Sequence, residues 1–229
     1  MWNLALACAF FLCIHLMISG TVLKEQIISS IGSLAYYALF SLFALVGLIW
    51  LCVAYAVYAV PDPLNVHVWD PPLFLRIIAL VGNFIAFQLV VVGLLSPSPS
   101  NLLATRRLPE RPVHGIIRIS RHPVLSGIGV WAAIHMMCNG NLASWLFFGS
   151  ILCLCALGAN NIDRKRMAVM GEAYASIKRR TSIIPFVAII EGRTAFAAEE
   201  LGAARMLLAA SLFSVFAVLH ELLFNTRVL

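Results

Sequence analysis

Two histidines lie inside apolar stretches that are long enough to cross a membrane. His15 follows Phe11-Leu12-Cys13-Ile14, and His135 follows Val130-Trp131-Ala132-Ala133-Ile134. A polar side chain at membrane depth is costly, so each of these residues needs an explanation. Neutral imidazoles from two helices of a bundle commonly hold a haem iron from both faces. His15 and His135 are therefore candidate metal ligands, and a hydrogen bond to a nearby carbonyl is the structural alternative for each.

A second cluster combines positive charge with a predicted helix start. Arg118, Arg121 and His122 stand directly before Pro123, a residue that suits the first turn of a helix, and Ser120 is a possible cap. A helix N-terminus also favours anions. We interpret Arg118 and Arg121 as candidate ligands of a phosphate, an acidic head group or a haem propionate. Simple anchoring of the membrane topology by basic residues is an equally good interpretation.

A third stretch, 163–186, is basic and amphipathic. It runs from Asp163 through Arg164-Lys165-Arg166 and Lys178-Arg179-Arg180 to Pro185, which is expected to end the helix. Such a pattern predicts a helix that lies along the membrane surface. A solvated helix face is the alternative.

The elements that must position these residues are membrane helices. Hydrophobic residues make up 62% of the 229 and charged residues 11%, against roughly 45–50% and 25% in soluble domains. This composition predicts an all-α, polytopic membrane helix bundle with about six transmembrane helices in a single domain, 1–229. The net charge of +6 does not indicate nucleic acid, because no polar domain carries it. The expected spans are Trp2–Gly20, Ser33–Val60, Leu73–Leu95, Val124–Met137, Leu142–Asn161 and about Ala204–Leu222.

The distribution of basic residues predicts the orientation. All of the 16 basic residues except Arg76 and Arg227 fall in the loops after the first, third and fifth expected helices. Positive loops stay on the cytoplasmic side, so both termini should lie outside. Four residues, Cys138-Asn139-Gly140-Asn141, join the fourth and fifth spans and predict an antiparallel helical hairpin.

Several segments together resemble one family, the NnrU membrane proteins. They are Ile14-His15, Trp69-Asp70-Pro71-Pro72, Arg118-Ile119-Ser120-Arg121-His122-Pro123, Trp131 to His135 with Asn139-Gly140-Asn141, Asp163-Arg164, and Thr181-Ser182-Ile183-Ile184-Pro185-Phe186 with Gly192-Arg193. The resemblance spans about residues 11–193 and leaves the last helix, 204–222, uncovered. It implies a multi-pass protein of the bacterial inner (cytoplasmic) membrane that supports denitrification, with nitric oxide reductase or other respiratory proteins as partners.

The same resemblance implies kinship with the plant zeta-carotene isomerase, which uses haem b to isomerise a polyene. His15 and His135 match the two axial haem ligands of that enzyme. The chain departs from the isomerase pattern at Ala132, where the enzyme has a cysteine, and at Leu154, where it has a histidine. These departures put redox-dependent ligand exchange and the full isomerase chemistry in question.

Geometry raises an objection to the histidine pair. If helices one and four start on opposite sides, His15 lies toward the cytoplasm, and His135 lies about 18 Å along its helix from Pro123. Nitrogens that share one iron must be only about 4 Å apart. Either the fourth helix starts deep in the bundle or tilts, or His122 is the partner of His15, and we keep His122 as the reserve ligand.

Four functions follow from these patterns. The first is a haem-binding accessory protein of nitrogen-oxide respiration, and the second is a haem-dependent isomerase of an apolar polyene that enters from lipid. The third is a methyltransferase, because Arg121-His122-Pro123 and Gly171-Glu172-Ala173-Tyr174 resemble the isoprenylcysteine and phospholipid methyltransferases. That resemblance implies S-adenosylmethionine as cofactor and Glu172 as a contact to it. The fourth is a non-catalytic scaffold.

Overall fold

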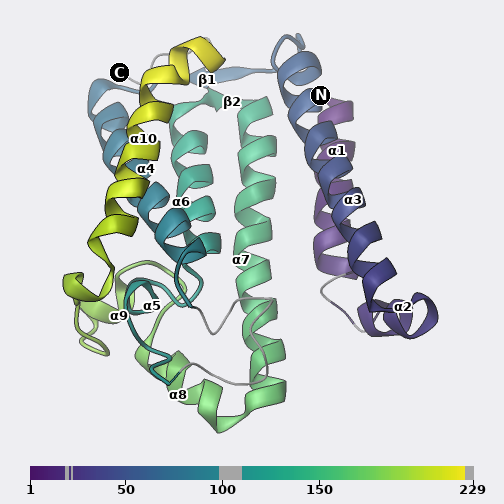
Figure 1. Cartoon of the computed structure of the whole chain (residues 1–229). Helices are drawn as coiled ribbons and strands as arrows, with labels where there is room; N and C mark the ends of the chain where they lie inside the picture. Colours follow the sequence, from purple (N-terminus) through teal and green to yellow (C-terminus); the bar gives the residue numbers. More distant parts are fainter. Residues whose placement is uncertain (19–20, 22, 98–109, 225–229) are drawn as a thin grey trace. The chain divides into compact units, whose positions relative to one another are not determined.

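The described part of the chain is mostly helical. The computed structural model describes residues 1–18, 21, 23–97 and 110–224, and within them the strands are the short β1 (His67–Trp69) and β2 (Gly140–Asn141) (Figure 1). The predicted all-α fold is confirmed. The described chain divides into two compact units, one of Met1–Pro71 and His135–Gly158 and one of Pro72–Ile134 and Ala159–Leu229. Each unit is described by itself below.

Four helices of the described chain are long and apolar enough to cross a membrane. They are Ser33–Ala59, which joins α3 (Ser33–Val53) to η2 (Ala54–Ala59), α4 (Leu73–Leu94), α7 (Leu142–Met170) and α10 (Ala203–Phe224). The most apolar 18-residue segment of each helix has a mean hydropathy of 2.0 to 2.4. Because at most 39% of any of these 18-residue segments is buried inside the protein, the helices need lipid to cover their apolar surface. The chain is therefore a multi-pass membrane protein.

The other two predicted spans differ from the expectation in shape and length. The first becomes α1 (Trp2–Cys13) and η1 (Ile14–Ile18), followed by α2 (Leu23–Ile31) at an angle of 78°. Residues 19 and 20 of that predicted span lie outside the described residues. The predicted fourth span is α6 (Pro123–Cys138), which has 16 residues. That length is about 24 Å of helix, short of a hydrocarbon core of about 30 Å.

In the first unit, α1 packs antiparallel against α3. The ring of Phe10 lies beside Gly47, where the missing side chain lets the helices approach closely. Near the start of α1, Trp50 Nε1 donates a hydrogen bond of 2.8 Å to Asn3 Oδ1. The amino terminus of Met1 forms an ion pair with Asp62. These contacts run from one end of the helix pair to the other and fix its register.

The β1–β2 pair closes the turn between α6 and α7. It is antiparallel, with His67 opposite Asn141 and Trp69 opposite Gly140. A Cβ atom on Gly140 would lie 2.0 Å from the carbonyl oxygen of Trp69, so only glycine allows this approach. Trp69 Nε1 also donates to the carbonyl of Met137 at 3.0 Å. The four-residue turn predicted between the two helices is present, and this strand pair holds it.

In the second unit, α4 packs against α10 and α6. A Cβ on Gly127 would come within 2.8 Å of the Ala86 carbonyl oxygen, which is the close small-residue packing that membrane helices use. Below this contact a core cluster joins the end of α4 to α5 (Ile116–Ile119) and α10. Its members are Leu89, Val92, Ile116, Ile117, Ile119, Leu201 and Ala209.

The helix α7 runs past the membrane. Its 29 residues correspond to about 44 Å, longer than the core of about 30 Å. It ends at Gly171, which has a φ of +52°, and α8 (Glu172–Arg180) turns back from there. The predicted amphipathic stretch is thus divided between two helices, and α8 ends before Pro185. The extension of α7 carries Asp163 to the start of α6.

Candidate functional site

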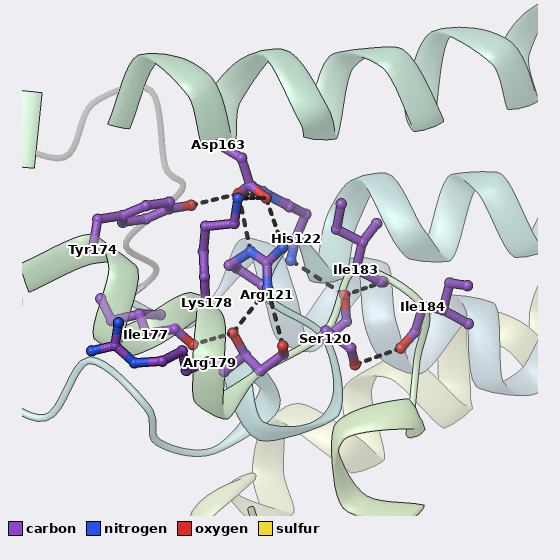
Figure 2. A network of polar contacts seen from close by, with 12 residues as sticks. Ser120, Arg121, His122, Asp163, Tyr174, Ile177, Lys178, Arg179, Ile183 and Ile184 are labelled. Carbon is purple, nitrogen blue, oxygen red and sulfur yellow. Dashed lines mark hydrogen bonds and ion pairs between the residues drawn. The ribbon is translucent and has the colours of Figure 1, made fainter. Parts of the chain in front are cut away.

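A buried carboxylate, Asp163, is the centre of a polar cluster in the second unit (Figure 2). Arg121 holds it with two hydrogen bonds, from Nε to Oδ1 at 3.0 Å and from Nη2 to Oδ2 at 2.6 Å. Both side chains are 5% exposed. A planar guanidinium paired in this two-pronged way to a carboxylate is the strong form of the interaction. The pair joins α7 to the segment before α6.

His122 shares the same carboxylate. Its Nε2 donates to Asp163 Oδ1 at 2.7 Å, and the residue is 2% exposed. Since Asp163 is ionised and can only accept, Nε2 carries the hydrogen of this bond. The Nδ1 of His122 is buried and has no hydrogen-bond partner among the described residues. A buried polar atom left without a partner costs about 1–3 kcal/mol.

Two residues of α8 complete the group around the carboxylate. The hydroxyl of Tyr174 donates to Asp163 Oδ1 at 2.8 Å, and Lys178 Nζ lies 3.9 Å from Oδ2. Tyr174 is fully buried. Burial raises the pKa of its phenol far above the usual value, and the hydrogen bond to the carboxylate raises it further. Tyr174 therefore remains protonated and acts as a hydrogen-bond donor.

The cluster also fastens the segment after α8. Arg121 Nη1 donates to the carbonyl and hydroxyl oxygens of Thr181 at 3.2 and 3.1 Å, and its backbone N–H donates to the carbonyl of Ser182 at 2.7 Å. The hydroxyls of Ser120 and Ser126 both reach the carbonyl of Ile183. Segments more than 50 residues apart in sequence are thus joined by buried hydrogen bonds. Ser120 also accepts from the His122 backbone N–H at 3.2 Å, close to the predicted capping role.

Arg118 is engaged elsewhere. It pairs with Glu200 through Nε at 2.7 Å and Nη2 at 2.8 Å, and the Gly115 backbone N–H donates to the same carboxylate at 2.7 Å. These hydrogen bonds, that from Arg118 first, lower the pKa of Glu200 to about 2. Arg118 and Arg121, expected to meet propionates or lipid, are each paired with a carboxylate of this chain. Glu172, expected to contact a methyl-donor cofactor, is exposed and pairs with Arg179.

Beside the cluster lies a small apolar cavity of about 140 Å³. Its lining is Ile85, Gln88, Leu89, Val92, Ile116, Ile119, Phe186, Phe196, Leu201 and Met206. Gln88 is the polar side chain of this lining. Its Nε2 donates to the Met206 carbonyl at 3.2 Å, and its Oε1 is buried without a partner among the described residues. The cavity can take an apolar group and offers that group one hydrogen-bond acceptor.

The two membrane histidines lie in the first unit. His15 is in η1, where its Nδ1 is 2.8 Å from the Phe11 carbonyl oxygen and its ring is 5.5 Å from that of Phe40. The carbonyl oxygen can only accept, so Nδ1 donates this hydrogen bond. The ring of His135 lies 4.9 Å from that of Phe148.

Their neighbours place the two histidines at different levels. Phe148 lies 6.0 Å from Tyr55, whereas the neighbour of His15 on the same continuous helix is Phe40. Fifteen residues separate Phe40 from Tyr55, which is about 20 Å of helix. Two axial ligands of one haem must bring their nitrogens to about 4 Å. The structure does not bring His15 and His135 together as a pair.

His122 does not replace the missing partner, because its Nε2 is bonded to Asp163 and its Nδ1 is buried. Across the described ranges, no group of three or more His, Cys, Asp or Glu side chains is arranged to hold a metal ion. A pair of axial histidines is smaller than such a group, so haem binding by this chain stays a prediction.

Sequence reasoning missed the residues that organise this site. Asp163 was placed at the start of the basic stretch and, with Thr181, in the family segments, but none of Asp163, Tyr174 and Glu200 was expected to be a buried or paired residue. A usable signal was present for Asp163, which is the lone acidic residue in a run of three basic ones directly after an apolar span. An acid at such a helix end indicates a partner, because an isolated buried charge is costly.

The apolar helices and the buried ionic cluster around Asp163 define the class of this protein: it is a multi-pass helical membrane protein with an ordered polar cluster. The chain belongs to the NnrU protein family, which it matches over residues 3–228. This match includes α10, which the motif resemblance had left uncovered.

Two curated proteins are similar to part of the chain. It is 38% identical over 117 residues to the 15-cis-zeta-carotene isomerase, chloroplastic, of Arabidopsis thaliana, covering 49% of this chain and 30% of that protein. With the enzyme of the same name from Zea mays it shares 37% over 103 residues, covering 43% of the chain and 28% of the enzyme. The match thus spans less than a third of the length of either relative. No solved structure matches the sequence.

Proposed function

We propose that this protein is a membrane isomerase that acts on a cis double bond of a long apolar polyene of the carotenoid class. The observation that carries the proposal is the similarity to two enzymes named as 15-cis-zeta-carotene isomerases. The expected role in denitrification has no comparable support, because neither relative is named for it. No contact in the site favours the methyltransferase alternative either.

The membrane helices suit such a substrate. A polyene hydrocarbon dissolves in the bilayer and reaches the protein sideways, through lipid-facing helices such as α4 and α10. The apolar cavity of about 140 Å³ between these helices and Phe186 is smaller than the roughly 300–1,000 Å³ of ordinary ligand pockets. It can therefore hold one end of a polyene while the remainder stays in lipid.

A cis-to-trans isomerisation needs no second substrate, because no atom is gained or lost. The enzyme must lower the order of one double bond for as long as the rotation takes. The expected histidine pair does not converge on one position, so we assign no step of the rotation to a haem. The contribution that we assign to this chain is binding and orientation of the substrate by the cavity, whose lining residue Ile119 directly precedes the Ser120-Arg121-His122 segment of the Asp163 cluster.

The test is isomerisation in the dark. The full-length protein is placed in liposomes with 15-cis-zeta-carotene, with and without added haem, and the geometric isomers are separated by chromatography. We expect the 15-cis isomer to disappear faster than in protein-free liposomes. Val92→Trp, which fills the cavity, should slow this loss, whereas Val218→Trp, at a site 80% exposed to lipid, should not. Equal rates with and without protein under both haem conditions would refute the proposal.

A further inference from the structure

The segment that follows α7 exposes both large apolar and basic side chains, whereas an ordinary solvated loop is expected to expose mainly polar ones. We define the strap as residues 172–196, which comprise α8 and α9 (Val187–Ile190) with their connections. Three large apolar residues of the strap are exposed, Ile184 at 67%, Ile190 at 81% and Phe196 at 53%. Three basic residues, Lys178, Arg179 and Arg180, are exposed at the end of α8.

The strap is fixed to the ends of the membrane helices. Phe186 and Ile189 pack against the core cluster that contains Leu89 and Val92 of α4 and Ala209 of α10. Leu89 lies five residues before the end of α4 at Leu94, a depth of about 8 Å. The strap therefore reaches the last turns of α4 and the first turns of α10. It lies at the boundary between lipid and water.

The strap is also a single structural piece. Arg193 Nη1 donates to the carbonyls of Arg179 and Thr181 at 3.0 and 2.6 Å, which ties α8 to the segment after α9. On its other face, Tyr174 and Ile177 are buried with Val113. The exposed apolar and basic side chains are thus held in place on a packed scaffold, so they form a fixed surface.

The charge of this surface selects the partner. The strap itself has four basic and two acidic side chains, and Arg164, Lys165 and Arg166 at the end of the preceding α7 are also basic. The two acids, Glu172 and Glu191, are paired with Arg179 and Arg193, and four basic minus two acidic side chains leaves the strap with a net positive charge. Apolar side chains that enter the acyl boundary, with Lys and Arg beside them, are the pattern of an element that lies in the membrane interface. Positive residues there are attracted by anionic lipid.

We propose that the strap is an interfacial anchor that binds the phosphate head groups of anionic phospholipids. Ile184, Ile190 and Phe196 enter the head-group region, and Arg179 and Arg180 contact the phosphates. The strap thereby fixes the depth of the Asp163 cluster at the membrane surface. This proposal does not depend on the isomerase activity.

The charge half of the proposal is tested by lipid selectivity. The full-length protein is reconstituted in phosphatidylcholine, and its association with spin-labelled phosphatidylglycerol is compared with that of spin-labelled phosphatidylcholine. We expect a preference for phosphatidylglycerol that falls with salt. The double variant Arg179→Gln with Arg180→Gln should lose about fivefold per residue removed. The control Arg76→Gln, at the other end of α4, should keep the preference.

The apolar half is tested by labelling two neighbouring positions. Ile190→Cys and Glu191→Cys are each treated with a membrane-impermeant maleimide in liposomes, with the wild-type chain as background. Both side chains are exposed on the protein itself. We expect Glu191→Cys to be labelled much faster than Ile190→Cys, because only the latter enters lipid. Equal labelling, or a phosphatidylglycerol preference that the double variant retains, would overturn the proposal; the former result would indicate a solvated or protein-docking surface.

Discussion

Replacing Asp163 by asparagine tests whether the buried cluster holds the polar side of the second unit together. The substitution keeps the shape of the side chain but removes the charge that Arg121 and His122 share. Breaking a buried ion pair from one side costs about 3–5 kcal/mol, because the remaining charge stays buried without compensation. We expect a loss of unfolding free energy in that range for Asp163→Asn.

The expected loss separates into contributions that other variants measure. Tyr174→Phe removes one hydrogen bond to the carboxylate and should cost about 1–3 kcal/mol, since the acceptor is charged. Arg121→Met leaves the carboxylate without its main partner and should cost about as much as Asp163→Asn. The double variant Arg121→Met with Asp163→Leu should be less destabilised than the sum of the single substitutions, because neither charge remains buried alone.

The assay is unfolding of the purified protein in mixed micelles by increasing denaturing detergent, followed by circular dichroism. Glu172→Gln is the matched control. It also removes a carboxylate from an arginine pair, but the Glu172 side chain is 78% exposed, so its loss should stay below about 1 kcal/mol. If Asp163→Asn is no more destabilising than Glu172→Gln, the cluster does not hold the segments together and the reasoning is refuted.

Three further predictions concern other parts of the molecule. The pKa of Glu200 falls from 4.5 to about 2 on folding, so the contribution of its carboxylate to stability is complete above about pH 4.5 and is lost as the pH falls toward 2. The difference in unfolding free energy between wild type and Glu200→Gln, measured against pH, should therefore disappear over that interval. A difference that stays constant would contradict this prediction. Gly140→Ala should destabilise the protein by more than about 1 kcal/mol, because the new Cβ would lie 2.0 Å from the carbonyl oxygen of Trp69 in β1. In thermal scans the control Gly149→Ala, whose Cβ would lie 3.6 Å from the nearest neighbouring atom, should be neutral or stabilised. In haem titrations followed by absorption, His135→Ala should leave intact any Soret band that requires His15, and equal loss of the band in both alanine variants would show that the two rings converge.

The membrane character of the chain could be predicted from its sequence alone. Long apolar runs need no tertiary information to be recognised, since about 20 apolar residues in helical form match the hydrocarbon thickness. For the same reason the bounds of α4 and α10 lie close to those predicted. Pro123 marked the start of α6 correctly, because the fixed φ of proline is a local property. The positive surface near α8 was also visible in the sequence.

The arrangement of the candidate site was decided by tertiary structure. Arg121 and Asp163 are 42 residues apart, and the sequence is equally consistent with two solvated charges. The ion pair exists because α7 extends beyond the membrane and places Asp163 against Arg121. Likewise, the levels of His15 and His135 depend on how α1 packs against α3 and on where α6 ends. Hydropathy depends on each residue's own transfer energy, whereas an ion pair or a shared ligand depends on the packing of distant helices, which no local pattern encodes.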